Sequence, residues 1–435
     1  MINKKNYNIE ILRAGLRMNN KILQPVRGTH DYYGDDMVLM RHIINVAQEM
    51  AQNYGFSEMQ TPVFEFADVF HRSLGETSDV VSKETYSFAD RGGEMLTLRP
   101  EFTASIVRAF ISGGYTQQLP FKAFYAGAAF RYERPQKGRM RQFHQIGGEC
   151  LGAKSPWQDC EIIACADAIL TKLLGRENIT LELNSLGDVE SRNNYREILV
   201  EYLHDFRADL SPESLVRLEK NPLRILDSKQ EADKAIVANA PIFSDYLSVP
   251  AQDWFAQVKA GLDALNINYV ISPRLVRGLD YYTHSVFEFV STELGAQATI
   301  LAGGRYNGLV AQLGGGDIAG VGFAAGIERI MILLQQKNWV APQMQAKIAL
   351  FTTDSQFEVD LLKIANNWRK NGVNCEILIS NNFSKAIKKA ESIKATHFVE
   401  YGETEKLSGK IKMRNLSTRN DSEYFNVNEL PNIIL

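Results

Sequence analysis

Apolar residues recur with helical spacing in two long segments of the N-terminal half, residues 35–54 and 156–174. Each segment is followed by a glycine, Gly55 or Gly175, at the position where helices commonly end. The second segment also has acidic residues near its start and a lysine near its end, which suits the helix dipole. The pattern therefore predicts two amphipathic helices. A strand-like segment, residues 56–66, follows the first of them.

The character of the chain changes over residues 188–270, which are rich in Glu, Arg, Leu and Ala and keep a helical spacing. We interpret them as a mostly helical insertion within a larger, strand-rich domain, residues 21–337. Strand signals return after the insertion, in YVISPRL and HSVFEFVST. Residues 1–20 form a polar tail, for which we expect disorder.

The last segment alternates between strand and helix patterns. The strand-like runs KIALFTT, NCEILI and HFVEYG are separated by two helix-like runs, and another strand-like run, KIKMRNL, follows. This order predicts a small α/β domain with a mostly parallel sheet at residues 346–435, after a linker at 338–345. From Ala341 on there are 13 basic and 11 acidic residues, a net charge of +2 against −5 for the rest. This slight basicity is weak evidence for a polyanionic partner.

Composition excludes several classes of protein. A length of 435 residues with 45% apolar and 23% charged residues does not fit a disordered chain, a collagen or a coiled-coil rod. The net charge of −3 means that any nucleic-acid contact must come from local patches. We expect no membrane span and no signal peptide, because long apolar runs are absent. Four cysteines without a CxxC and seven histidines without an HxxxH predict no structural zinc site and a cytoplasmic protein.

Common nucleotide-binding and hydrolase motifs are absent from the sequence. There is no GxxxxGK[ST] and no GxSxG, and GVGFAAG at residues 320–326 has the spacing GxGxxxG, which is not that of a dinucleotide-binding loop. A phosphate would therefore have to be bound mainly by side chains.

The segment FRYERPQKGRMRQFHQ, residues 130–145, has five basic residues and one acidic residue between Arg131 and Arg141. Pro135 and Gly138 mark a turn, and strand-like residues on both sides predict a β-hairpin with a cationic loop. Such a loop can neutralise phosphates, which the planar guanidinium group fits well. The alternative is a solvated basic loop without a ligand.

Four further segments contain residues that suit an ionic ligand. In LVRGLDYYTH, Arg277 lies among apolar residues and needs an anionic partner, which Asp280 or a ligand could supply. The six glycines of residues 302–317 would admit a ligand or a neighbouring strand, or form a flexible loop. Arg329, near the start of an apolar helix, opposes the helix dipole, so it either faces solvent or binds something else. Glu101 could bind an ammonium group or form a surface ion pair.

Together these motifs resemble those of the class II aminoacyl-tRNA synthetases, and among them the histidyl-tRNA synthetase family. YGFSEMQTPVFE is similar to the first class motif, with Pro62 at a dimer interface, FRYERPQKGRMRQFHQIGGE to the second, and GVGFAAGIERI to the third. LVRGLDYY and AGGRYNGL match the two stretches that mark the histidine-specific branch. The resemblance covers residues 21–435. It implies an α+β fold, in which an antiparallel catalytic sheet with flanking helices carries the helical insertion and precedes an α/β anticodon-binding domain.

The resemblance also implies roles for individual residues. Arg131 and Arg277 would be catalytic, holding the α-phosphate of ATP from opposite sides and contacting the histidine. Glu133 would receive the adenine amino group, and Phe143 would stack on the adenine ring. Arg329 would lie over the adenine and reach the γ-phosphate.

Further residues are implied in binding histidine and tRNA. The α-amino group would be bound by Glu101, Thr103 and Gln145, the imidazole by Glu149, Tyr281 and Tyr282, and the tRNA acceptor end by Arg139 and Arg141. Where the family usually reads RPEGT this chain has RPEFT, which places Phe102 beside Glu101.

The implied function is ATP-dependent ligation of L-histidine to tRNA-His through a histidyl-adenylate, with release of AMP and diphosphate. The resemblance further implies a requirement for ATP and Mg²⁺ and a homodimeric assembly. The alternative is a regulatory paralogue that does not aminoacylate and acts on ATP phosphoribosyltransferase in histidine biosynthesis. Such paralogues lack the anticodon-binding domain and usually erode the second motif, whereas this sequence keeps both.

Overall fold

The computed structural model describes residues 22–75, 80–228, 230–276, 281–341, 346–380, 382–422, 424–427 and 429. The predicted tail, residues 1–20, lies outside these ranges. The chain divides into two compact units, residues 1–339 and residues 340–435. In the described part of the chain, no helix is both long and apolar enough to cross a membrane.

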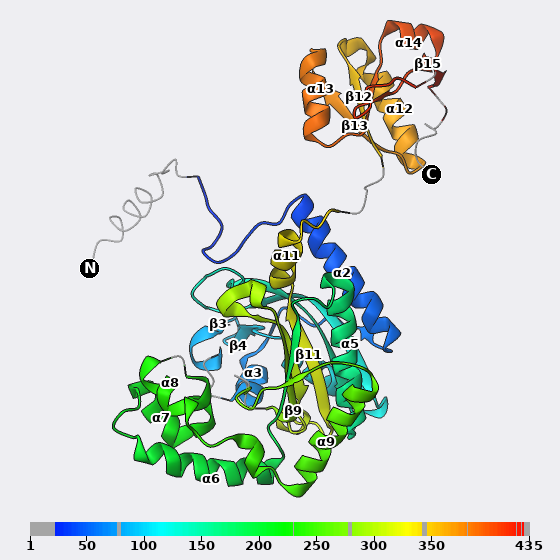
Figure 1. The fold of residues 1–435 in the computed structure, drawn as a ribbon. Coiled ribbons are helices and arrows are strands. Elements are labelled where there is room, and N and C mark those ends of the chain that lie inside the picture. The colour runs from blue at the N-terminus through cyan, green and yellow to red at the C-terminus, as the bar shows by residue number, and fades with distance from the viewer. Residues whose placement is uncertain are drawn as a thin grey trace, which may run out of the picture. The chain divides into compact units, whose positions relative to one another are not determined.

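The first unit is built on an eight-stranded sheet with the strand order β1-β5-β6-β11-β10-β9-β7-β8 (Figure 1). Its strands are β1 (Ser57–Glu58), β5 (Phe121–Phe130), β6 (Gln142–Leu151), β7 (Thr180–Ser185), β8 (Val270–Ile271), β9 (Thr283–Val290), β10 (Thr299–Arg305) and β11 (Gly320–Gly326). Neighbouring strands are antiparallel except for the parallel pairs β1–β5 and β7–β8. The predicted cationic hairpin is confirmed, because β5 and β6 pair along their whole length and residues 131–141 join them.

Four helices pack against the large sheet and share one apolar core with it. They are α2 (Asp35–Asn53), α5 (Pro156–Leu174), α9 (Val249–Ala264) and α11 (Ile327–Gln336). The two helices predicted from apolar spacing are confirmed as α2 and α5, which lie side by side (Figure 1). Ser155 caps α5 by accepting a hydrogen bond from Trp157 N, and Gly175 ends it with a φ of 74°.

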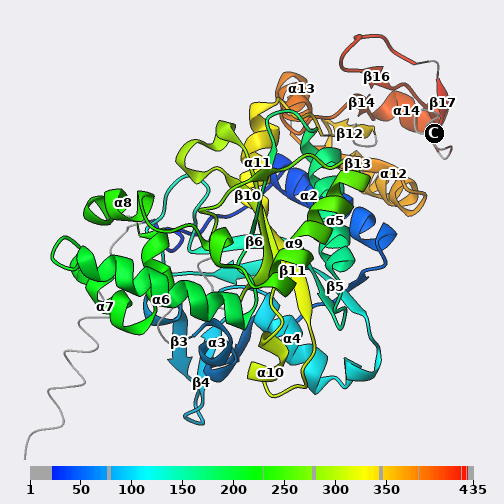
Figure 2. The same cartoon turned by 60° about the horizontal axis from the view of Figure 1, so that its bottom comes forward.

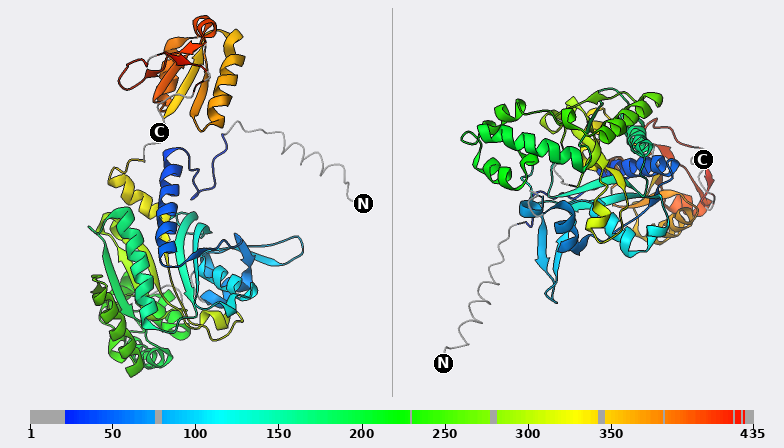
Figure 3. Two further views of the ribbon diagram at one scale, coloured as in Figure 1. Left: turned by 90° about the vertical axis from the view of Figure 1, so that its right-hand side faces the viewer. Right: turned by 90° about the horizontal axis from the view of Figure 1, so that it is seen from below.

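A second, three-stranded antiparallel sheet has the order β2-β4-β3. Its elements and their neighbours are β2 (Phe64–Phe66), α3 (Ala67–Leu74), the short turn η1 (Val80–Glu84), β3 (Tyr86–Ala89), β4 (Met95–Leu98), α4 (Thr103–Ser112) and η2 (Tyr115–Gln117). The β3–β4 hairpin projects from the body of the unit (Figure 3). The single strand predicted at residues 56–66 is therefore wrong. β1 belongs to the large sheet and β2 to the small one, and Pro62 between them has no N–H to continue a ladder.

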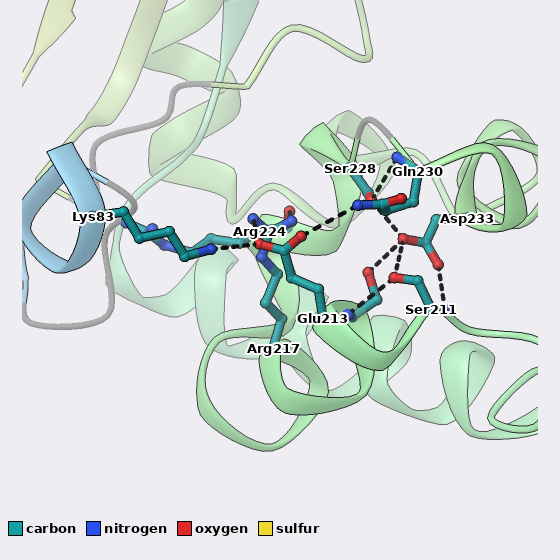
Figure 4. Close-up of polar contacts among 9 residues, drawn as sticks. Lys83, Ser211, Glu213, Arg217, Arg224, Ser228, Gln230 and Asp233 are labelled. Carbon is teal, nitrogen blue, oxygen red and sulfur yellow. Dashed lines mark hydrogen bonds and ion pairs between the residues drawn. The ribbon is translucent and has the colours of Figure 1, made fainter. Parts of the chain in front are cut away.

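The insertion forms a helical layer with its own apolar core, grouped beside the small sheet (Figure 2). Its elements are α6 (Val189–Asp205), α7 (Pro212–Lys220), η3 (Pro222–Asp227), α8 (Glu231–Ala238) and η4 (Phe243–Tyr246). The buried Asp233 carboxylate accepts hydrogen bonds from the hydroxyls of Ser211, Ser214 and Ser228 (Figure 4). These hydrogen bonds connect α8 to α7 and to the loops on either side of it. The last helix of the predicted insertion, α9, packs on α5.

Among the described residues, an ion pair between Lys83 and Glu213 links the insertion to the rest of the first unit. Lys83 of η1 lies 3.0 Å from the Glu213 carboxylate of α7, which also contacts Arg217 at 3.1 Å (Figure 4). The insertion is thus fastened beside the small sheet through an exposed charged contact.

The second unit, residues 340–435, combines helices with a small mixed sheet. A four-stranded sheet has the order β13-β12-β14-β16, with β12 parallel to both of its neighbours and β16 antiparallel to β14. The elements are β12 (Lys347–Thr352), η6 (Ser355–Phe357), α12 (Glu358–Lys370), β13 (Asn374–Ile379), α13 (Phe383–Ser392), β14 (His397–Glu400), α14 (Glu403–Ser408), β15 (Lys410–Ile411), β16 (Arg414–Asn415) and β17 (Phe425–Asn426). The strand predicted from KIKMRNL is instead two short strands, β15 and β16, in different sheets.

Candidate active site

A cleft of about 660 Å³ opens in the first unit over the strands β6, β11, β10 and β9. Eleven of the thirteen predicted site residues line it, namely Glu101, Thr103, Arg131, Glu133, Arg139, Phe143, Gln145, Glu149, Tyr281, Tyr282 and Arg329. Arg277 lies outside the described residues, as does Asp280, so neither of the two proposed partners of Arg277 is tested. Arg141 does not line the cleft.

Glu149 of β6 is a buried carboxylate in this cleft. Thr103 donates a hydrogen bond to one carboxylate oxygen at 2.7 Å, and Tyr125 donates to the same oxygen at 3.2 Å. Tyr306 donates to the other oxygen. On the neighbouring strand β11, a side chain in place of Gly322 would collide with the carboxylate, so the glycine leaves the space that Glu149 needs. Burial raises the pKa of Glu149 to about 8.

Glu101 lies at the start of α4, where its carboxylate accepts backbone hydrogen bonds from Thr103 N at 2.7 Å and Ala104 N at 2.9 Å. It is 4% exposed, so the alternative of a surface ion pair is wrong. Burial raises its pKa. Near it, the Gln145 Oε1 atom is buried and has no hydrogen-bond partner among the described residues. A buried acceptor of this kind suits a ligand that brings an N–H donor.

Phe102, the residue that departs from the family pattern, does not line the cleft. Its ring stacks on the Tyr125 ring with 4.4 Å between centroids. The guanidinium of the buried Arg99 lies 3.8 Å from the centroid of the Phe102 ring. Arg99 itself donates to backbone carbonyls of Thr61 and Ala128. Phe102 therefore supports Tyr125, one of the hydroxyl donors to Glu149, rather than filling the cleft.

The cationic loop supplies the opposite part of the cleft. The Arg131 Nε atom donates to Pro100 O at 2.9 Å, and its guanidinium lies 5.5 Å from the Phe143 ring centroid. Arg139 lies 3.3 Å from the Glu133 carboxylate. These four side chains all line the cleft, where a planar group could lie beside Phe143 while an anion contacts the arginines.

Arg329 reaches from the first turn of α11 across the cleft wall. Its guanidinium donates to Gly138 O in the cationic loop at 3.4 Å and to Thr299 O at the start of β10. Burial lowers its pKa, and the nearby Arg139 adds to this effect. The side chain is partly buried, so the alternative of a solvent-facing arginine is wrong.

Three tyrosines gather beside Glu149. The ring centroids of Tyr281 and Tyr282 are 4.7 Å apart, and the Tyr306 ring meets Tyr281 edge-on at 5.6 Å. Burial raises the pKa of Tyr281 and Tyr306 well above the ordinary value. Their hydroxyls therefore stay protonated and can act as neutral hydrogen-bond donors.

Several residues of the site were missed by sequence reasoning. Tyr125 and Tyr306 donate to Glu149, and Glu182 and Glu288 also line the cleft. Tyr306 follows Arg305, whose fully buried guanidinium forms an ion pair with Asp159 and donates to backbone carbonyls of Ala153 and Ser155. The signal was present, because an arginine and a tyrosine interrupt the glycine-rich run 302–317. We interpreted the glycines there and not the two large residues.

Comparison with known proteins gives the family. A sequence model described as Histidyl-tRNA synthetase matches residues 28–330, and a model described as Anticodon binding domain matches residues 345–435. The chain belongs to the histidyl-tRNA synthetase family. Proteins named Histidine--tRNA ligase from Rhodospirillum rubrum and Gluconobacter oxydans are 50% and 49% identical to it. The alignments cover 91% and 92% of this chain and 95% and 96% of the relatives.

A solved structure of apo Staphylococcus aureus histidyl-tRNA synthetase is also similar. It is 32% identical, has a TM-score of 0.78 and aligns over 93% of this chain and 98% of its own. The predicted α+β fold of the class II synthetases is thereby confirmed. The match of residues 345–435 to the anticodon-binding model disfavours the regulatory paralogue, because the resemblance implies that such paralogues lack this domain.

Proposed function

We propose that this chain ligates L-histidine to tRNA-His in two steps. Histidine and ATP first form a histidyl-adenylate with release of diphosphate, and the histidyl group then passes to the tRNA with release of AMP. The observation that carries the proposal is Glu149, a buried carboxylate with hydroxyl donors on both oxygens, in the same cleft as the cationic loop. A carboxylate and a cationic loop in one cleft suit a small ligand with an N–H donor at one end and a reacting phosphate at the other.

On the histidine side, Glu149 accepts a hydrogen bond from one imidazole N–H, and a hydroxyl of Tyr281 or Tyr282 serves the other nitrogen. Glu149 already accepts three hydroxyl hydrogen bonds, and a carboxylate offers about four acceptor positions. One position therefore remains for the ring. Glu101, Thr103 and Gln145 bind the α-amino group, which the unpartnered Oε1 atom of Gln145 supports.

On the ATP side, Arg131 and Arg277 stabilise the α-phosphate as the histidine carboxylate attacks it and diphosphate leaves. Glu133 receives the adenine amino group, Phe143 stacks on the ring and Arg329 lies over it toward the γ-phosphate. No covalent enzyme intermediate is needed, so catalysis consists of positioning and charge stabilisation. The contact between Arg131 and Phe143 supports this division of the site.

We also propose that ATP is bound with Mg²⁺. No group of three or more His, Cys, Asp or Glu side chains in the described ranges could hold a metal by itself. Glu182 of β7 and Glu288 of β9 both line the cleft and face one another across the strand pair. Glu288 also accepts a hydrogen bond from Thr299 Oγ1 at 2.7 Å and lies near Arg329, on the side of the cleft assigned to ATP. Mg²⁺ commonly uses one or two carboxylates together with substrate phosphates, whose charge it neutralises, so these residues fit it.

For tRNA, we assign Arg139 and Arg141 to the loop that meets the acceptor end, and residues 346–435 to the anticodon. The separate α/β unit with a net charge of +2 from Ala341 on supports the second assignment. We further propose a cytoplasmic protein, because the free cysteines, all four of them buried, suit a reducing compartment.

A homodimer formed through the region that follows α2 is the proposed assembly. Cross-strand pairing places Phe64, Leu98 and Tyr86 in one row and Phe66, Leu96 and Phe88 in the next, all on the same face of the small sheet. The three phenylalanines are exposed. The opposite face carries Glu65, which pairs with Arg108 of α4. An exposed apolar face of this kind is typical of a protein interface.

ATP–diphosphate exchange measured with each of the twenty amino acids tests the proposed activity. Exchange should depend on L-histidine, and charging should be observed only with tRNA-His. Exchange that is supported equally by several amino acids, or no exchange at all, would contradict the proposal.

A further inference from the structure

We propose that the N-terminal segment 26–32 is a strap that positions the ATP-binding groups, with Gly28 and Tyr32 as its positioning residues. Neither residue lines the cleft. Both line instead a second cavity, which shares Gly138, Met140 and Glu328 with the cleft. The proposal rests on the ATP-binding roles assigned above to Arg131, Glu133 and Arg329.

Gly28 contacts the base of the cationic loop. Its carbonyl accepts hydrogen bonds from Arg141 N at 2.7 Å and from Gln142 N at 3.3 Å. Its φ is +86°, and a Cβ atom at this position would lie 2.8 Å from Arg141 Cγ and 3.0 Å from Pro135 Cγ. The backbone conformation and the lack of space both require glycine here.

Arg141 connects Gly28 to the ATP-binding residues through hydrogen bonds. Its carbonyl accepts a hydrogen bond from Arg131 N at 2.9 Å, and its Nε atom donates to Glu133 O at 3.3 Å. Between these two residues, the Tyr132 ring lies 3.9 Å beneath the Arg141 guanidinium. Tyr132 N also donates to Glu84 O at 2.7 Å. The position of Arg141 therefore fixes three consecutive residues of the loop, two of which are assigned to ATP.

Tyr32 contacts the other side of the ATP site. Its hydroxyl donates to Glu328 at 3.2 Å, and its ring meets the His144 ring edge-on at 5.7 Å. Glu328 also accepts from His144 N at 3.0 Å, so it joins β6 to the first turn of α11. Arg329 is the next residue. Burial and the nearby Glu328 raise the pKa of Tyr32, which keeps the hydroxyl a donor.

Among the described residues, the strap reaches the adenylate site through groups assigned mainly to ATP, whereas the hydrogen bonds of Glu149 come from Thr103, Tyr125 and Tyr306. Loosening the strap should thus raise the KM for ATP in ATP–diphosphate exchange more than the KM for histidine, because Arg131 is also assigned to histidine. A purely structural role would affect both constants together or only the unfolding temperature.

The test uses two variants, each with a matched control. Gly28→Ala is compared with Gly34→Ala, because Gly34 also has a positive φ of 60° but open space where a Cβ atom would lie. Tyr32→Phe removes one hydroxyl and keeps the ring, and it is compared with Tyr33→Phe at a residue that is 91% exposed. We expect the KM for ATP to rise roughly tenfold in Gly28→Ala and roughly fivefold in Tyr32→Phe.

Equal changes in both KM values, or strap variants that behave as their controls do, would overturn the proposal. The same holds if only the unfolding temperature falls. Arg131→Lys separates this proposal from the site assignment. If Arg131→Lys leaves exchange intact, the ATP site itself is assigned wrongly. If it abolishes exchange while the strap variants match their controls, only the strap fails.

Discussion

At the scale of single residues, Glu149 is the group whose change should separate histidine binding from ATP binding. Glu149→Gln keeps the shape and, in assays above about pH 8 where Glu149 is ionised, removes the charge that receives the imidazole N–H. A hydrogen bond to a charged group is worth more than a neutral one, so the KM for histidine should rise roughly 10–100-fold while the KM for ATP stays unchanged. ATP–diphosphate exchange measures both constants. Equal effects on the two, or none on histidine, would show that Glu149 does not contact the ring.

The same residue makes stability depend on pH. Burial raises the pKa of Glu149 from 4.5 in the unfolded chain to about 8 in the folded protein. The stabilisation gained by binding this proton is fully present below about pH 4.5 and is lost as the pH rises through about 8. Glutamine does not titrate. The unfolding free energy of the parent protein relative to Glu149→Gln should therefore fall over this interval in urea titrations, and a constant difference would contradict the shifted pKa.

Single residues could be proposed from the sequence when a motif named their chemistry, as with Glu149 and Arg131. Their partners could not. Tyr125 and Tyr306 donate to Glu149 from β5 and from the end of β10, 24 and 157 residues away in sequence. Only the strand order β5-β6-β11-β10 brings these three segments together. No local pattern contains that order.

At the scale of elements, local periodicity was sufficient to predict an element that buries one of its faces. The helices α2 and α5 and the β5–β6 hairpin are of this kind. Periodicity failed where the chain changes sheets within a few residues. The segment 56–66 supplies β1 and β2 to two sheets, and the choice is made by the long-range pairs with β5 and β4.

The buried ion pair of Arg305 and Asp159 fixes the end of β10 on α5, so this contact should be sensitive to change. Asp159 also accepts hydrogen bonds from Trp254 Nε1 at 2.9 Å and Ser285 Oγ at 2.7 Å. Asp159→Asn leaves the guanidinium buried without its counter-charge, so unfolding free energy in urea should fall by about 3–5 kcal/mol.

The matched control is Asp317→Asn. Asp317 pairs with Lys154 at 2.6 Å, but its side chain is 81% exposed, and such pairs contribute at most about 1 kcal/mol. If the two variants lost similar stability, the buried pair would not hold β10 on α5.

At the scale of the whole molecule, the apolar face of the small sheet should join two copies of the chain. Phe64→Glu together with Phe66→Glu places two charges on this face without touching the cleft. The variant should sediment as a monomer, with reduced exchange activity because Glu101 and α4 follow directly from this sheet. Val189→Glu, at an exposed apolar residue of α6, is the control and should remain a dimer. A parent protein that is monomeric and fully active would contradict the proposed assembly.

The two compact units are assigned different roles in charging tRNA, and a truncated chain can separate these roles. The whole cleft belongs to residues 1–339, so a chain that ends at Trp339 should keep ATP–diphosphate exchange with histidine. If residues 346–435 read the anticodon, the same truncation should weaken charging of full-length tRNA-His. A minihelix that carries only the acceptor stem has no anticodon to lose, so its charging should be the same with both chains. Undiminished charging of the full tRNA by the truncated chain would show that the second unit does not read the anticodon.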